Sequence, residues 1–303
     1  MAGLQTLFFL GKGGTGKSTV SALLSLVLKE KGQKVLLASF DDAHNQSDIF
    51  QAQLSDKACT LGPCLEVLQV DRDKEIKRYL AKTAQKVKAS YSYLTAFNLD
   101  NYFDILKFSP GMEEYALVTA FMDLQTRFKD YDYLLIDMPP TALSLRFFNL
   151  PTLSLTWTDQ LEKLRLEIYK RKEIVSRIKM AGKEFERDKV LNRIREIKAE
   201  YQALNAIFKD PVKSRFFVVL NDDILSVAET RRIIEQLKVL TIELKALVCN
   251  DRKIEDQNSR TIETTFASIP IQRIPYSSSS LIGMPALEKH IVASGLTFDH
   301  LMN

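Results

Sequence analysis

A glycine-rich loop near the start of the chain constrains its fold more than any other feature. Residues 11–19 read Gly-Lys-Gly-Gly-Thr-Gly-Lys-Ser-Thr, which satisfies the phosphate-binding pattern G-x-x-x-x-G-K-[ST]. A short apolar run at 4–10 precedes the loop, and apolar residues recur at helical spacing over 18–28 after it. Because strand, loop and helix come in the order that this motif requires, the sequence predicts a nucleotide site.

Each loop residue has a physical role in that prediction. Glycines at 13, 14 and 16 let the backbone turn tightly and aim its N–H groups at a phosphate. Lys17 is expected to reach the terminal phosphates and Ser18 to offer its hydroxyl to Mg²⁺, while the next helix directs its positive end at the anion. The nucleotide-binding residues predicted in the loop are Gly13, Gly14, Thr15, Gly16, Lys17, Ser18 and Thr19.

Lys12 occupies a position that the pattern leaves free. The loop backbone already surrounds its own phosphates, so this lysine is better placed to serve a nucleotide held by a second chain. There it would stabilise charge on the transferring phosphoryl group. The alternative is a solvated surface lysine. The first hypothesis also predicts an oligomer, because one chain could not complete its own site.

Composition sets the outer limits. A chain of 303 residues with 46% hydrophobic content can bury a large core, and we expect one domain over 1–303. Cys59, Cys64 and Cys249 are an odd number without C-x-x-C spacing, so neither a disulfide framework nor zinc is predicted. No apolar run reaches the roughly 18 residues of a membrane helix. These features predict a cytoplasmic protein, not an integral membrane protein, and leave peripheral membrane association open.

Short apolar runs alternate with helical stretches along the rest of the chain. Such runs are typical of a parallel sheet covered on both faces, so the sequence predicts an α/β fold with a doubly wound, mainly parallel sheet flanked by helices. Helical insertions at about 71–128 and 152–210 are expected to form a helical subdomain. The further predicted strands are 34–39, 65–70, 133–136, 215–220 and 244–249.

Acidic side chains stand where two predicted strands end, which is where ligands bind in such sheets. Asp137 closes an apolar strand and is placed like a Walker B carboxylate, which holds Mg²⁺ directly or through water. Asp41 is the better candidate for orienting the attacking water. For Asp42 and Asp48, capping of the next helix is an equal alternative to a catalytic role.

The segment 158–210 predicts a helical hairpin, with a break near Gly182. Apolar residues recur at three- and four-residue steps, first in 161–168 and then in 191–208, and give each helix one apolar stripe. Many lysines and arginines lie between these stripes. The pattern favours a solvated hairpin packed on its own subdomain, and the alternative is a surface for a partner, possibly an acidic one.

Four runs of sequence together resemble the arsenical-pump ATPase family, which also contains the ATPases that target tail-anchored membrane proteins. The runs are 12–19, 41–48, 110–114 and 137–151, and further matches extend through 223, 229–231 and 248–250 to 275. The family's first switch reads D-P-A-H-x-x-S-D and its second D-T-A-P-T-G-H-T-L-R-x-x-x-L-P. The resemblance covers nearly the whole core and includes the family's deviant Walker A loop with its signature lysine.

The resemblance implies roles in ATP hydrolysis at matching positions. Lys12 corresponds to the signature lysine acting across a dimer, and Lys17 to the lysine on the phosphates. Asp41 corresponds to the aspartate that positions water, and Asp137 to the Walker B aspartate that holds Mg²⁺ together with Ser18.

The resemblance also implies contacts to the rest of the bound ATP or ADP. Asn250 corresponds to the asparagine that reads adenine, whose edge suits an amide with both donor and acceptor. Asp223 corresponds to an acidic residue near the nucleotide at the dimer interface. Pro275 falls in the loop that covers the base.

The chain departs from the family at the switches and at the metal and client motifs. Asp42 replaces the proline of the first switch, and Ala142 and Leu143 replace Gly-His in the second, which leaves switch mobility and client coupling open. The zinc-binding C-x-x-C, the arsenite-responsive cysteines and a methionine-rich client groove are not matched, with only seven methionines present. A single phosphate loop means that two sites need two chains.

The sequence therefore predicts a dimeric, Mg²⁺-dependent ATPase that opens and closes on an unknown protein client or membrane partner. A homodimer is expected, and a heterodimer with a related ATPase is the alternative arrangement. Two other functions stay open: a partition or positioning ATPase that binds DNA, and a regulatory scaffold with little hydrolysis. Nucleic acid is the less favoured partner, and residues 294–303 carry no basic amphipathic membrane helix.

Overall fold

The structure, a computed structural model, describes residues 3–43, 45–90, 109–179, 189–251 and 259–302. Its centre is an eight-stranded sheet in the order β3-β4-β2-β5-β1-β6-β7-β8. All neighbouring strands in this sheet are parallel except β3 and β4. The strands are β1 (Gln5–Leu10), β2 (Val35–Ser39), β3 (Cys59–Gly62), β4 (Leu65–Gln69), β5 (Tyr133–Asp137), β6 (Ser214–Leu220), β7 (Leu244–Asn250) and β8 (Ile271–Ile274).

Helices cover both faces of the sheet, and the predicted α/β fold is confirmed. One face packs against α1 (Lys17–Glu30), α2 (Asn45–Phe50), α10 (Met284–Ser294) and α11 (Asp299–Met302). The other face packs against α5 (Met112–Arg127), α6 (Thr141–Lys179), α7 (Lys189–Lys209), α8 (Ile224–Val239) and α9 (Ser259–Thr265). The helix α3 (Arg72–Ser90) packs on α5 outside these layers.

The strand beneath the glycine-rich loop shows why the sheet is buried on both sides. Successive residues of β1 point to opposite faces, with Phe8 in one core cluster and Phe9 in the other. Phe8 stacks on Phe216 of β6 at 4.8 Å between ring centroids and meets the edge of Phe148 of α6 at 5.1 Å. This aromatic packing fixes the end of β1 from which the loop departs.

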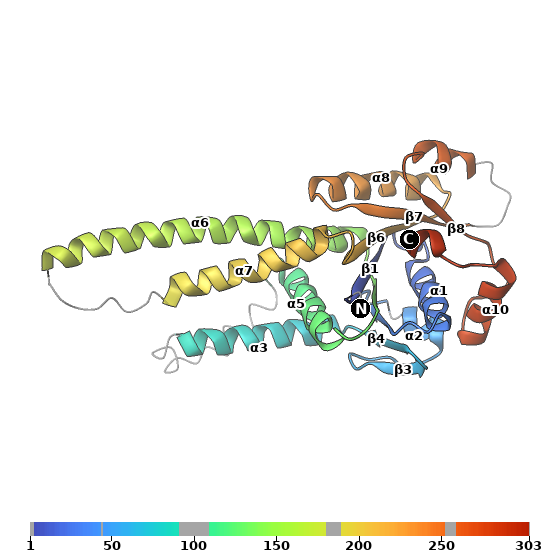
Figure 1. Cartoon of the computed structure of the whole chain (residues 1–303), viewed down its shortest axis with the longest axis horizontal. Helices are drawn as coiled ribbons and strands as arrows, with labels where there is room; N and C mark the ends of the chain where they lie inside the picture. Colours follow the sequence, from blue (N-terminus) through green and yellow to red (C-terminus); the bar gives the residue numbers. More distant parts are fainter. Residues whose placement is uncertain (1–2, 44, 91–108, 180–188, 252–258, 303) are drawn as a thin grey trace.

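The helices α6 and α7 run side by side and project beyond the sheet (Figure 1). The expected boundary at 152 lies inside α6, which begins at Thr141 and continues through Pro151. It begins early because Phe147, Phe148 and Leu150 are buried against the sheet before the helix leaves it. The expected break near Gly182 and the residues 91–108 of the other insertion lie outside the described residues.

Two strands were not predicted. β3 and β8 are four-residue edge strands with mainly half-buried side chains, so they lack the continuous apolar run that marked the others. Among the described residues, no helix has both the length and the apolar character needed to cross a membrane.

Candidate nucleotide-binding site

The glycine-rich loop leaves β1 in the middle of the sheet, where three strands end together. In the strand register Asp137 of β5 lies beside Phe9 of β1 on one side and Ser39 of β2 on the other. The peptide N–H of Phe40 donates to the Asp137 carbonyl oxygen at 2.8 Å. The fold thus brings the loop, Asp41 and Asp137 to one edge of the sheet, as the sequence predicted.

The loop backbone is held in a conformation that favours glycine. Gly11 has φ of 146°, and a Cβ there would lie within 3.0 Å of the Val219 carbonyl oxygen on β6. Gly14 and Gly16 have φ of 80° and 91°. The hydroxyl of Thr15 donates to the Lys12 carbonyl oxygen at 2.9 Å and closes the turn. A loop held in this way is preorganised for a phosphate.

Helix α1 presents its positive end to the loop. It begins at Lys17 with Gly16 as its N-cap, has no side-chain cap, and carries no acidic residue in its first turn. Both Lys17 and Ser18 are buried, while Thr19 is half-buried. A buried ammonium group beside uncapped N–H groups is an anion site, which agrees with the predicted phosphate position.

Asp137 is the most perturbed acid of the site. It is fully buried, and that burial raises the pKa of its carboxyl group to about 6, although the Ser18 hydroxyl, the Lys17 charge and Gln46 act in the opposite direction. The nearby charge of Asp41 also raises this pKa. Its Oδ1 atom is buried without a hydrogen-bond partner. An unpartnered carboxylate oxygen beside a serine hydroxyl fits Mg²⁺, which takes few protein oxygens and completes its shell with water and phosphate.

The two acids of the first switch have different partners. Asp41 Oδ1 accepts a hydrogen bond from the Ala43 N–H at 3.2 Å, which orients its carboxylate near Asp137. Asp42 instead forms an ion pair with Arg72 at the start of α3, and Arg72 also pairs with Glu113 of α5 at 3.3 Å. The sequence offered helix capping as one role for Asp42, and this ion pair with Arg72 was not among the predicted roles. Asp48 lies in the first turn of α2, where an acid stabilises the helix.

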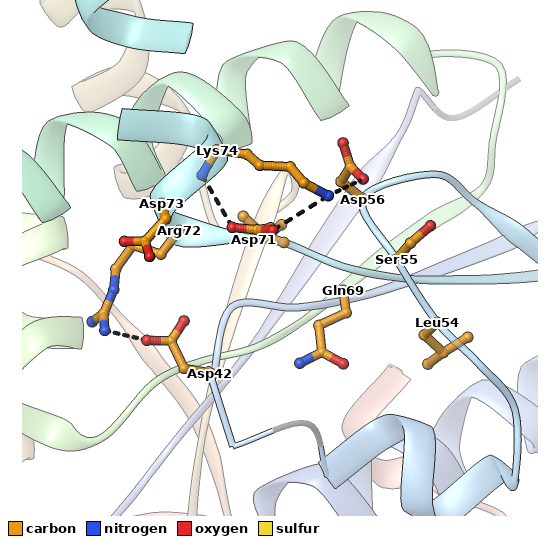
Figure 2. A pocket seen from close by; sticks show the side chains of 10 residues that line it. Asp42, Leu54, Ser55, Asp56, Gln69, Asp71, Arg72, Asp73 and Lys74 are labelled. Carbon is orange, nitrogen blue, oxygen red and sulfur yellow. Dashed lines mark hydrogen bonds and ion pairs between the residues drawn. The ribbon is translucent and has the colours of Figure 1, made fainter. Parts of the chain in front are cut away.

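A pocket of about 400 Å³ lies beside the Asp42–Arg72 pair. Figure 2 shows this pair on one side of the pocket and Lys74 with Asp56 and Asp71 on the other. No residue of the glycine-rich loop lines it, so this pocket is separate from the predicted phosphate position. Its lining residues are Asp42, Leu54, Ser55, Asp56, Gln69, Val70, Asp71, Arg72, Asp73 and Lys74.

Lys12 and Asp223 lie together at the open side of the loop. Lys12 Nζ is 3.9 Å from Asp223 Oδ1, and the two side chains are 39% and 34% exposed. Asp223 is also the N-cap of α8, because its Oδ1 accepts from the Ser226 N–H at 2.8 Å. Asp223 therefore has a structural role in α8, and its position at a dimer interface stays a prediction.

Asn250 and Pro275 follow neighbouring strands next to the loop. Asn250 ends β7 and is paired in register with Ile274 of β8, so the exposed Pro275 lies beside it. The amide Nδ2 of Asn250 donates to the Thr15 carbonyl oxygen at 3.1 Å. The structure thus brings the predicted adenine-reading residue onto the loop itself, and its contact to adenine stays a prediction.

Two site features escaped the sequence. Gln46, in the first turn of α2, is fully buried and donates to Asp137 Oδ2 at 3.1 Å. The available signal was its spacing, because Ile49 and Phe50 follow three and four residues later and are buried on the same face. In the second switch Leu143 packs in the core while Ala142 is exposed, which separates the two departures from the family pattern.

The fold and the site define a P-loop nucleotide-binding protein whose loop carries a second lysine. The sequence model of the family described as anion-transporting ATPase matches residues 4–293, and this chain therefore belongs to that family. It is an ATPase, as the family and its relatives are, and the predicted family resemblance is confirmed.

Curated relatives match along three quarters or more of their length. A protein of Aquifex aeolicus (strain VF5), named among the arsenical pump-driving ATPases, is 29% identical over 301 residues, which cover 94% of this chain and 97% of the relative. ATPase get3 of Schizosaccharomyces japonicus is 27% identical, covering 94% and 91%. The ATPase ASNA1 homolog of Cryptosporidium parvum is 25% identical, covering 92% and 75%.

Proposed function

We propose that this chain is a Mg²⁺-dependent ATPase that acts as a dimer, with two copies of the chain as the simplest form, and that hydrolysis drives opening and closing on a protein partner. The observation that carries the proposal is the partly exposed position of the Lys12 side chain. Its side chain extends toward Asp223 and solvent at the mouth of a site whose other cation, Lys17, is already buried. If a second chain faced this side of the site, the Lys12 ammonium group could contact the nucleotide bound to that chain.

The positions of the described residues support a separate role for each of them in ATP hydrolysis. Loop N–H groups and Lys17 bind the phosphates, and Ser18 and Asp137 hold Mg²⁺, which when bound neutralises phosphate charge. Asp41 is oriented by the Ala43 N–H and aligns the attacking water. Lys12 of the partner subunit stabilises the charge that develops on the transferring phosphoryl group.

The surface beside Lys12 supports association. Ile224 and Leu225, in the first turn of α8 directly after Asp223, are 79% and 68% exposed. Two adjacent exposed aliphatic side chains next to a functional cation are typical of a surface that another protein covers. We expect the dimer to bury both of them.

A second exposed surface supports coupling to a partner. Leu153, Trp157, Leu161, Leu164 and Ile168 of α6 are all exposed, Trp157 by 69%, and their spacing places them on one face of the helix. The sequence favoured a solvated hairpin packed on its own subdomain, and α6 and α7 do pack on each other, but among the described stripe residues Leu204 and Phe208 of α7 are buried while the α6 stripe stays exposed. An apolar partner surface fits this α6 stripe better than an acidic one.

The basic residues of the hairpin support a DNA-binding function less well than the α6 stripe supports a protein partner. Among the described residues, Arg195 and Lys198 of α7 pair with Glu162 of α6 at 2.7 and 3.0 Å, and Arg193 pairs with Glu196 at 2.8 Å. These contacts agree with a solvated hairpin whose charges are partly balanced within it.

Complementation between two inactive variants tests the proposal. Lys12→Ala should bind ATP but not hydrolyse it, and Asp41→Asn should also be inactive while still supplying its lysine. In a 1:1 mixture, half of the dimers are mixed and each has one complete site, so about a quarter of wild-type activity should return.

Two results would contradict the proposal in different ways. Full activity of Lys12→Ala, or no recovery in a mixture shown to contain mixed dimers, would refute the role of Lys12 across the dimer. Absence of Mg²⁺-dependent hydrolysis in the wild type would instead favour the regulatory scaffold.

A further inference from the structure

Gln46 lies at the centre of the site, and no step described above uses it. Its Nε2 atom is 3.0 Å from the Ser18 carbonyl oxygen, 3.0 Å from Ser21 Oγ and 3.1 Å from Asp137 Oδ2. Gln46 and Ser21 are both fully buried. One amide thus joins the helix that begins at the phosphate loop to the carboxylate predicted to hold the metal.

The chemistry of its neighbours fixes how this amide is oriented. A carbonyl oxygen and a carboxylate oxygen can only accept, so the amide must present its NH₂ group to Ser18 and Asp137. The Ser21 hydroxyl gives its own proton to the Ser18 carbonyl oxygen at 3.0 Å, so its oxygen is a third acceptor, and the two N–H groups of Gln46 are shared among the three. The reversed amide would place an oxygen against three acceptors.

This orientation divides the two oxygens of Asp137 into different roles. Oδ2 is held by Gln46, whereas Oδ1 is buried without a hydrogen-bond partner. A carboxylate held at one oxygen cannot rotate freely about its Cβ–Cγ bond, so the other oxygen keeps one direction. Mg²⁺ demands near-ideal octahedral geometry and is sensitive to the direction of its ligands.

We infer that Gln46 is a positioning residue for the metal site: by holding Asp137 Oδ2 it aims Oδ1 at Mg²⁺. Because Gln46 follows Asp41 closely on the same switch segment, the metal ligand is correctly aimed only while that segment is docked on the site. The inference rests on the proposed Mg²⁺-dependent ATPase and names how its first switch is coupled to its metal.

The test separates metal binding from nucleotide binding with Gln46→Met, which keeps the length of the side chain and removes the donor. A fluorescent ATP analogue is titrated in EDTA and then over a Mg²⁺ series. We expect affinity in EDTA to be unchanged and the Mg²⁺ concentration that half-maximally tightens binding to rise about 10- to 100-fold, the usual cost of losing a residue that orients a metal ligand.

Ile49→Val is the matched control, because Ile49 is buried on the same face of α2 without a polar contact to Asp137. It should destabilise the helix packing while leaving the Mg²⁺ midpoint unchanged. Gln46→Asn, whose amide is one methylene too short to reach Asp137, gives a second variant if Gln46→Met does not fold. It should show the same shift.

Each outcome decides between clear alternatives. A wild-type Mg²⁺ midpoint in the Gln46 variants would overturn the inference. Equal weakening of binding in EDTA and in Mg²⁺ would also overturn it, because a merely structural role affects both. If the wild type itself shows no response to Mg²⁺, the proposed metal-dependent function fails, and the inference fails with it.

Discussion

Replacing Asp137 by asparagine should stabilise the metal-free protein while removing the carboxylate that we propose to hold Mg²⁺. The wild-type carboxylate is fully buried, and burial raises the pKa of Asp137 from its ordinary 3.8 to about 6. In the absence of Mg²⁺ the folded state therefore pays to ionise a group that the unfolded chain ionises freely. A neutral amide of the same shape avoids this cost.

The size and sign of the effect follow from the two pKa values. Below pH 3.8 the carboxyl group is protonated in both states, and the ionisation penalty is absent. Between pH 3.8 and 6 the unfolded chain ionises first, so wild-type stability falls as pH rises. Above pH 6 the penalty is constant at about 3 kcal/mol, from a pKa difference of about two units.

Urea unfolding in EDTA, without nucleotide, measures this difference for the wild type and for Asp137→Asn. The introduced amide leaves an N–H without a partner where Oδ1 was, and this subtracts a constant amount from the gain. The informative quantity is thus the pH dependence: the advantage of the variant should grow by about 2 kcal/mol between pH 4.5 and 7, mostly below pH 6. Equal m-values would show that both proteins expose the same surface.

Mg·ATP should reverse the order, because only the wild type gains stability from binding the metal at this position. An advantage of the variant that is independent of pH, or one that persists unchanged with saturating Mg·ATP, would refute the reasoning. The first result would show that burial does not penalise the Asp137 carboxylate, and the second that Asp137 does not hold the metal.

Two further predictions concern the loop and the α6 stripe. Gly11→Ala should lower the free energy of unfolding by about 3 kcal/mol, because a Cβ would press on the Val219 carbonyl oxygen and the backbone φ of 146° disfavours any side chain. Gly13→Ala is the control and should be nearly neutral, because no atom lies within 4 Å of the added Cβ. Urea unfolding without nucleotide measures both. Trp157→Ser should change stability by less than about 0.5 kcal/mol yet weaken capture of a protein partner. Since Trp157 is the chain's single tryptophan, a blue shift of wild-type emission on partner binding would report coverage of the stripe, and an unchanged spectrum in a confirmed complex would argue against it.

The sequence predicted those strands whose burial on both faces requires a continuous run of apolar residues. Six apolar runs became β1, β2, β4, β5, β6 and β7 with nearly the expected bounds, because a strand covered on both faces must be apolar throughout. The four-residue edge strands β3 and β8 have no such run. The motif likewise predicted that the loop lies between β1 and α1 and that Asp137 ends β5, because both depend on position along a strand, loop and helix, while their roles stay predictions.

What the sequence could not provide were contacts between distant segments. The Asp42–Arg72 ion pair and the bond from Asn250 to Thr15 depend on how separate strand ends converge. Gln46 presented a polar residue on an apolar helix face, but only the structure shows that its partner is Asp137. The exposed face of α6 shows the same limit, because periodicity identifies a stripe but does not say what covers it.

Helix α6 begins close to the candidate site and ends far from it. Its 39 residues form one rod of about 58 Å that begins at Thr141, just after the strand that ends in Asp137. For a rod of this length, each degree of tilt at its base moves the far end by about 1 Å. A tilt of a few degrees at the base of α6 would therefore displace its far end, at Lys179, by several ångströms, which is the kind of movement that the proposed coupling to a partner on its outer face requires.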